Sequence, residues 1–492
     1  MKKTYGVCVG MLAMGLAVLG APVSRAQSRM AAGESAGGSE TTSAASTSVA
    51  AAPAASSPVD LDRRIEALEA ELSELKTEMA AKKDAETTVA SEAAATPAVP
   101  AQDAKAPEKI TVSSLLGPTS VSGFVDGYYQ VNFNHPDQTL YPGAGYRAFD
   151  FRDKSINLNM AELILDKAPS AVSTTSRIGY HVALGYGDGM DVYGSFDPNG
   201  GTQFLLKEGY GSYLAPIGKG LQIDFGKFVT PMGAEVVESK DNWNYSRGLL
   251  FTWAIPFYHF GVRAKYTVND KLSVTGFLVN GWNNVTDNNS GKTYGFTVGW
   301  TPTKQVSAYI SYLAGPEQAP GTYTFNSNDV WRQTWDAVVA FNPTAKLSFL
   351  ANFDYARGDR GSSDLTVPPI YWTGLAGYVK YALTDNDYVA GRYEYFLDHD
   401  GFAMTSSIPS NFLASIPASN FNSFGGLNKL HLNEFTLTYT HTFASYFLTR
   451  FEYRRDNSQF PIFALSNFTP GAKYQNTAEI GLIFLFDSRN TK

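Results

Sequence analysis

The chain has one cysteine among 492 residues, Cys8, and it lies close to the N-terminus. Two lysines at positions 2 and 3 precede an apolar stretch at 7–19, and Ser24-Arg25-Ala26 forms a small-x-small site. This combination is typical of a cleaved secretory signal peptide, which we place at residues 1–26. The mature chain is then expected to be exported and free of cysteine, so it has neither a disulfide nor a thiol nucleophile.

Charge, and positive charge in particular, is also scarce. Charged residues make up 17% of the chain and its formal net charge is −7, which gives no basic surface for nucleic acid. After the N-terminal segment, no apolar run approaches the ~20 residues of a membrane-spanning helix. The six histidines are scattered, and the Gly-x-Ser-x-Gly and His-Glu-x-x-His motifs do not occur. We therefore expect no enzyme, no cofactor and no bound metal.

Aromatic residues and glycine are abundant, with 28 Tyr, 31 Phe and 44 Gly. Over 294–312 large side chains such as Phe296 and Trp300 fall on every second position, and small ones such as Gly295 and Thr297 fall between them. This period of two predicts β-strands with one aromatic face and one small polar face.

Strand-like segments follow one another over residues 119–486, and we count about 16 of them. Short connections such as 269–270 and 301–304 alternate with long ones such as 135–154, 230–257 and 398–429. This pattern predicts an all-β fold, a transmembrane antiparallel barrel in the outer membrane with both ends in the periplasm. Its aromatic face meets outer-membrane lipid and its small polar face meets water. A large secreted sandwich or a β-helix is the alternative.

Charges on the water-facing side of the strands support the barrel, because a charge stays solvated in an aqueous lumen. The segment 446–454 carries several of them on that side. Only at 156–166 does the alternation fail, around Glu162, and a β-bulge there would restore it. These charges either line the pore or pair across strands to brace its wall, so ion preference stays open. The pore-lining candidates are Asp126, Lys227, Arg263, Lys265, Arg392, Glu394, Arg450, Glu452 and Arg454.

The stretch 224–263 is the most distinctive part of the sequence. It contains Gly226-Lys227-Phe228, the run 230–235, Asn244-Tyr245-Ser246-Arg247 and Pro256-Phe257-Tyr258-His259. In these motifs, and more weakly at 123–126 and 161–163, the chain from 121 to 486 resembles the OmpL-like β-barrel porin family. The resemblance implies a water-filled channel for passive diffusion of small hydrophilic solutes or ions.

The connection 230–257 is the third long one, and the third loop of trimeric porins narrows the lumen. The resemblance therefore places Glu235, Glu238, Asp241, Arg247 and His259 near a constriction, where fixed charge sets ion preference. The alternative is that these groups pair with one another and hold the shape of the loop.

Outside the barrel we expect linkers at 27–58 and 84–118 and a coiled coil at 59–83. In this coil Leu61, Ile65, Leu68, Leu72, Leu75 and Met79 recur at heptad spacing. We expect the coil to lie in the periplasm and to support a homotrimer. A barrel that tethers the membrane to the cell wall through this coil is the alternative function.

The last strand places Ile480, Leu482, Phe484 and Phe486 on one face, followed by a tail at 487–492. This arrangement is typical of the signal that the barrel-assembly machinery recognises. We further expect aromatic girdles at the two rims, with Trp300 and Phe341 at one and Trp282 and Tyr355 at the other. The acidic, glycine-rich segment 185–201 is expected to be a flexible loop without calcium.

Overall fold

In this computed structural model, the structure describes residues 117–136, 146–195, 206–317, 327–358, 369–404, 416–421, 426–466 and 471–490. The signal peptide, the first linker, the coiled coil at 59–83 and the second linker up to residue 116 lie outside the described residues. These parts of the sequence analysis stay predictions.

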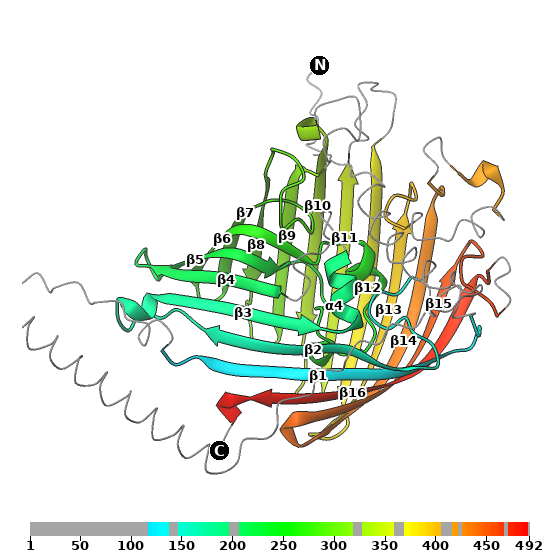
Figure 1. The fold of residues 1–492 in the computed structure, drawn as a ribbon, viewed down its shortest axis with the longest axis horizontal. Helices are drawn as coiled ribbons and strands as arrows, with labels where there is room; N and C mark the ends of the chain where they lie inside the picture. Colours follow the sequence, from blue (N-terminus) through cyan, green and yellow to red (C-terminus); the bar gives the residue numbers. More distant parts are fainter. Residues whose placement is uncertain are drawn as a thin grey trace, which may run out of the picture. The chain divides into compact units, whose positions relative to one another are not determined.

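Sixteen antiparallel strands form one closed sheet (Figure 1), in which each strand pairs with its neighbours in sequence and β1 pairs with β16. The strands are β1 Ser120–Asn132, β2 Ile156–Lys167, β3 Ile178–Tyr186, β4 Leu206–Ala215, β5 Leu221–Val229, β6 Tyr258–Asn269, β7 Leu272–Val279, β8 Thr293–Trp300, β9 Val306–Pro316, β10 Trp331–Phe341, β11 Leu347–Gly358, β12 Ile370–Ala382, β13 Asp387–Asp398, β14 Leu430–Phe443, β15 Phe447–Ser458 and β16 Tyr474–Asp487.

Helices are few and short in the described parts of the chain. Two are α-helical, α4 Asp188–Ser195 and α5 Leu249–Trp253, and neither is long or apolar enough to cross a membrane. The 3₁₀ segments are η1 Thr175–Arg177, η2 Ser239–Asp241, η3 Ser327–Asp329, η5 Ala418–Asn420, η6 Ala444–Tyr446 and η7 Ser488–Asn490.

Connections of different length lie on the two rims of the barrel. The connections after even-numbered strands are short, as at 270–271 and 301–305, and those after odd-numbered strands are long, as at 230–257 and 399–429. Both ends of the barrel lie on the short-turn rim, where Ser122 pairs with Asp487. The predicted strand number and the predicted alternation of connections are both confirmed.

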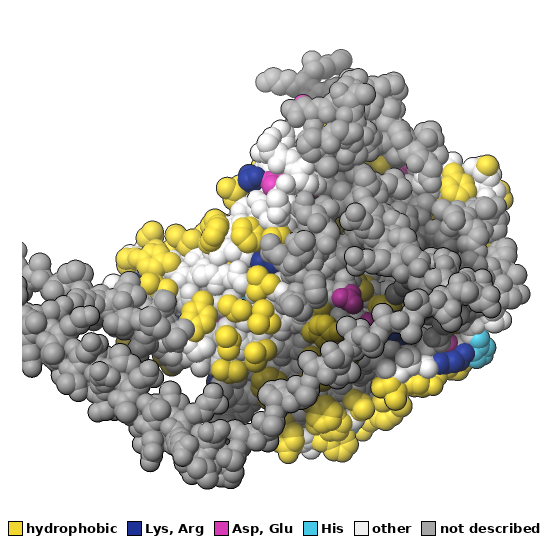
Figure 2. Space-filling view, in the orientation of Figure 1, with side chains coloured by type: hydrophobic (Ala, Val, Ile, Leu, Met, Phe, Trp, Pro, Cys, Tyr) yellow, Lys and Arg dark blue, Asp and Glu magenta, His cyan; other side chains and the backbone are white. Residues whose placement is uncertain are grey.

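Burial follows the alternation that the sequence predicts. On β11, Phe353 points outward and is 45% exposed, whereas its neighbour Asp354 points inward and is fully buried. On β15, Phe451 and Tyr453 are exposed while the charged residues between and beside them are buried. Figure 2 shows hydrophobic side chains gathered on the outer face of the strands. The barrel therefore has an apolar exterior and a polar interior, the reverse of a protein that folds around a hydrophobic core in water.

The irregular segment on β2 contains a register shift, as predicted. The pairing of β1 with β2 shifts between Asp126 and Gly127, opposite Met160 and Leu158. Because of this shift, Leu158 and Leu163 are both exposed on the outside although they differ in parity, and Glu162 points inward.

Two expectations from the sequence are wrong. Residues 188–195, expected in a flexible loop, form helix α4, with Tyr193 buried against the rings of Phe257 and Tyr258. Trp282, expected in an aromatic girdle, is buried inside the barrel against Trp372. The sequence pattern suggested a loop for 188–195 and a rim position for Trp282, but packing inside the barrel determines the structure of both.

Candidate functional site

The third long connection, residues 230–257, enters the barrel, and we call it the lumen loop. It contains η2 and α5, and the side chains of α5 are all buried. The loop leaves the wall between β5 and β6, yet its hydrogen bonds reach β1, β11, β13, β14 and β15. It therefore crosses the lumen to the opposite wall.

Two wall glutamates hold the middle of the lumen loop by its backbone. Glu452 on β15 accepts hydrogen bonds from the amides of Tyr245 (2.6 Å) and Ser246 (3.1 Å) and from the hydroxyl of Thr438 (2.6 Å). Glu394 on β13 accepts a bond from the amide of Leu249 at the start of α5. Hydrogen bonds to a charged acceptor are stronger than neutral ones. These two carboxylates thus fix the segment 245–249 to the far wall.

Three wall arginines bind the carbonyl groups of the same loop. Arg392 donates to the carbonyl of Ser246 (2.6 Å), Arg454 to that of Arg247 (2.7 Å), and Arg450 to those of Asn242 (2.7 Å) and Asn244 (3.0 Å). Glutamates therefore hold the amides and arginines hold the carbonyls. Wall side chains therefore bind both the amides and the carbonyls of the loop backbone.

Further hydrogen bonds attach the loop to β1 and β11. Tyr245 donates its hydroxyl to Asp126 on β1 (2.7 Å), and Ser239 donates to the other oxygen of the same carboxylate (2.8 Å). On the other side of the lumen, the amide of Ala234 donates to Asn352 on β11 (3.0 Å). The loop is thus fixed at several points around the wall.

The five residues predicted at the constriction have different surroundings. Glu235 is buried and pairs with Arg392 at 2.6 Å, and Glu238 contacts Lys207. Arg247 is buried and donates to the carbonyls of Val237 and of Tyr245.

The other two lie at opposite extremes of exposure. Asp241 is exposed beside Lys240, at 2.5 Å. His259 is fully buried in the wall, with Nδ1 3.0 Å from the carbonyl oxygen of Gly281 and its ring stacked on Phe277. Of the five residues, only Asp241 has an exposed side chain.

Most of the nine predicted pore-lining residues are buried as well. Arg263 is half-buried and pairs with Asp224 at 2.7 Å, and Lys227 is buried with its ammonium 4.3 Å from the centre of the Tyr258 ring. Asp126, Arg392, Glu394, Arg450, Glu452 and Arg454 are the loop-binding residues described above and are buried. Lys265 is the one exposed member of the nine, on the inner face of β6.

Sequence reasoning missed Lys207, which is buried on β4 and binds both oxygens of Glu162 at 3.0 Å in addition to Glu238. Glu162 was the signal that could have found it, because a buried carboxylate inside the barrel requires a cationic partner. The search then leads to an inward-facing lysine on a nearby strand.

A closed barrel with an apolar exterior, a charged interior and a loop bound inside its lumen defines a channel protein of the outer membrane. Residues 118–486 match the sequence profile of the beta-barrel porin-2 family, OmpL-like, and the chain belongs to this family. The expected family is thereby confirmed, and the protein is an outer-membrane porin for passive diffusion.

Solved structures of other outer-membrane proteins are similar to the chain. They include in-vitro folded OmpT of Vibrio cholerae (13% identity, 75% of this chain and 97% of that chain, TM-score 0.47). The anion-selective porin of Comamonas acidovorans (8%, 75% and 99%, 0.48) and the channel DcaP of Acinetobacter baumannii (11%, 75% and 97%, 0.45) are two others. No curated protein matches the chain in sequence.

Proposed function

We propose that the lumen loop forms the constriction of this porin and that the channel acts without enzymatic chemistry. The observation that carries the proposal is the attachment of the loop backbone to wall charges on β13 and β15. Held in this way, the loop narrows the lumen and keeps its position while solutes pass. Solutes then pass along the part of the wall that the loop leaves accessible.

That accessible wall is formed by the inner faces of β5 to β9. Near the short-turn rim its side chains are mostly small or polar, and they include Thr267, Ser273 and Ser307 with Tyr309, which is 45% exposed. Asp224, Arg263 and Lys265 are the charged residues that face inward there, and the first two pair with each other. Lys265 therefore gives the described part of this path a positive charge, and we propose a weak anion preference.

The functions of the remaining predicted parts are also proposals. We propose that Asp241 with Lys240 forms the charged edge of the constriction. The barrel-assembly machinery is expected to recognise the outward face of the last strand, formed by Ile480, Leu482, Phe484 and Phe486. The coil at 59–83 is expected to lie in the periplasm and to support a homotrimer. Tethering to the cell wall is the second candidate function, and it needs the coil but not the lumen loop.

Planar bilayers test the channel. The refolded full chain should give stepwise currents, and a KCl gradient should give a reversal potential of the sign for anion preference. The substitution Lys265→Glu should reverse that sign, because it replaces the exposed positive charge of the path by a negative one.

Lys271→Glu is the matched control, since Lys271 lies in the turn between β6 and β7 outside the lumen. It makes the same charge change and should leave the sign as it is. A folded barrel without current would refute the channel, and equal shifts in both variants would refute the proposed path along β6.

A further inference from the structure

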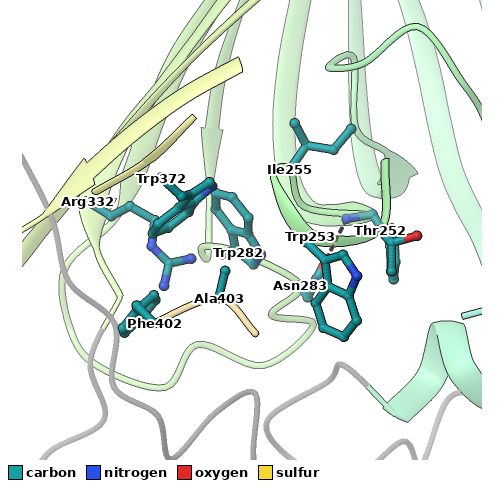
Figure 3. A pocket seen from close by; sticks show the side chains of 10 residues that line it. Thr252, Trp253, Ile255, Trp282, Asn283, Arg332, Trp372, Phe402 and Ala403 are labelled. Carbon is teal, nitrogen blue, oxygen red and sulfur yellow. Dashed lines mark hydrogen bonds between the residues drawn. The ribbon is translucent and has the colours of Figure 1, made fainter. Parts of the chain in front are cut away.

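Arg332 on β10 points into the barrel and is enclosed by aromatic rings (Figure 3). It is 5% exposed, and its guanidinium carbon lies 4.3 Å from the centre of the Trp282 ring, 5.6 Å from that of Trp372 and 5.8 Å from that of Phe402. Aromatic faces attract a cation but do not neutralise it. The charge of Arg332 therefore remains to be balanced.

No hydrogen bond or ion pair to Arg332 is found within the described ranges, and its Nε is buried without a partner. The nearby carboxylate of Glu317 interacts with Arg332 electrostatically but without a hydrogen bond between the two side chains. That carboxylate already accepts hydrogen bonds from the amide of Trp282 and the hydroxyl of Thr293, both at 2.8 Å. By contrast, Arg392 and Arg454 are paired with carboxylates. A buried donor without an acceptor costs free energy. The buried guanidinium of Arg332 therefore lacks an acceptor that would stabilise it.

The indole nitrogens of the tryptophans around Arg332 are further donors. The indole nitrogen of Trp253 donates to the carbonyl of Tyr146 (3.2 Å), and that of Trp372 donates to the carbonyl of Ala254 (3.1 Å). For the indole nitrogen of Trp282 no such bond is found in the described part of the chain. Two donors at this pocket, the Arg332 guanidinium and the Trp282 indole nitrogen, thus lack an acceptor among the described residues, which favours an anion.

The pocket is small and lies on the long-loop side of the lumen loop. Its walls come from α5 and the residues after it (Thr252, Trp253, Ile255, Phe257), from the long connection after β7 (Trp282, Asn283), and from the one after β13 (Phe402, Ala403). Arg332 and Trp372 complete it. Its volume of about 10 Å³ is enough for one particle the size of a water molecule. Chloride and one end of a small carboxylate are somewhat larger than a water molecule, so binding such an anion requires a slight outward shift of the surrounding rings.

We propose that this pocket binds a small monovalent anion, either chloride or the carboxylate group of a solute, between the Arg332 guanidinium and the Trp282 indole N–H. The site lies between the long-loop mouth and α5 of the lumen loop. An anion bound there completes the hydrogen bonds of both donors and is held before the constriction. The site goes beyond the proposed channel function, because binding requires the pocket and not conduction.

Fluorescence quenching of the refolded full chain in detergent micelles tests the proposal without any current. Bromide is the probe, because it quenches tryptophan fluorescence and is closer to chloride in size than iodide is, and Trp253, Trp282 and Trp372 line the pocket. We expect a saturable component of quenching in addition to the linear collisional one. Competition by chloride but not acetate would assign the site to inorganic anions, and competition by both would extend it to carboxylates. Linear quenching that neither anion displaces would overturn the proposal.

Substitutions of the two proposed donors test whether they bind the anion. Arg332→Gln should raise the Kd of the saturable component by about tenfold or more, since it removes a charged donor. Arg357→Gln is the matched control, because Arg357 lies on the outward face of β11, and it should leave the Kd unchanged. If Arg332→Gln does not fold, as judged by heat-modifiable migration in gels, Trp282→Phe removes the second donor and keeps the aromatic wall. An unchanged Kd in a folded variant of either donor would contradict the site.

Discussion

Replacing Glu452 by alanine tests whether the wall charges hold the lumen loop in place. The carboxylate accepts three hydrogen bonds, two of them from the loop amides of Tyr245 and Ser246. Each hydrogen bond to a charged group contributes about 1.5 to 3 kcal/mol. Water in the lumen replaces part of this and the contributions are not additive, so we expect a loss of about 2 to 4 kcal/mol for the attachment of the loop.

A loss of that size raises the equilibrium constant for local opening of the loop by roughly 30-fold or more. Two measurements should show it. Amide hydrogen exchange at 244–250 should accelerate, because local opening controls exchange there. Single-channel recordings should show added current noise and a changed mean conductance, since the loop then samples more than one position.

Two control variants distinguish an effect on the lumen loop from a general effect on the barrel wall. Glu452→Gln retains one acceptor oxygen, so its effect should lie between those of wild type and Glu452→Ala. Asp224→Asn changes a buried lumen carboxylate that contacts Arg263, Ser212 and Gln222 but not the loop, and it should leave exchange at 244–250 unchanged. Wild-type exchange and quiet currents in folded Glu452→Ala would refute the idea that wall charges hold the constriction.

Two further predictions concern other buried charges. Burial raises the pKa of Glu317 to about 7, with Arg332 opposing and Asp287 adding to the increase. Below pH 7 Glu317 is protonated and no longer repels an anion beside Arg332, so bromide should bind at pH 6 more tightly than at pH 8 by about threefold or more. Glu317→Gln should bind equally at both values, and a pH dependence that persists in this variant would argue against Glu317 as its source. Lys207→Met leaves the buried carboxylate of Glu162 and the half-buried one of Glu238 without their cation, which should destabilise the barrel by about 3 to 5 kcal/mol. The heat-modifiability midpoint measures this loss, and an unchanged midpoint would show that these carboxylates are balanced in another way.

The fold could be predicted from the sequence because its signal is local and repeated. On β11 and β15 the alternation of aromatic and polar residues determines which side chain meets lipid, and no distant contact is needed to read it. Helix α4 and the inward position of Trp282 could not be predicted in this way. Both depend on packing inside the barrel, as between Tyr193 and Phe257 or between Trp282 and Trp372.

The candidate site was only half predictable for a related reason. Parity shows that Arg450, Glu452 and Arg454 point into the lumen, but it does not show what they meet there. Their partners are backbone groups of the lumen loop, about 200 positions earlier in the chain. Backbone amides and carbonyls occur at almost every position, so a sequence does not show which of them bind a side chain. A charged residue that holds a loop and one that attracts a solute therefore give the same sequence pattern.

This difference changes how the charge of the chain relates to its selectivity. The formal net charge of −7 would favour cations if all charges faced the pore. Instead, most of the lumen carboxylates that we describe are buried against arginines, lysines or loop amides. Fixed charges act on a passing ion over short distances and only where they are not neutralised. The selectivity of the described path therefore depends on the few charges that the wall leaves uncommitted, and the exposed one on β5 to β9 is the cation of Lys265.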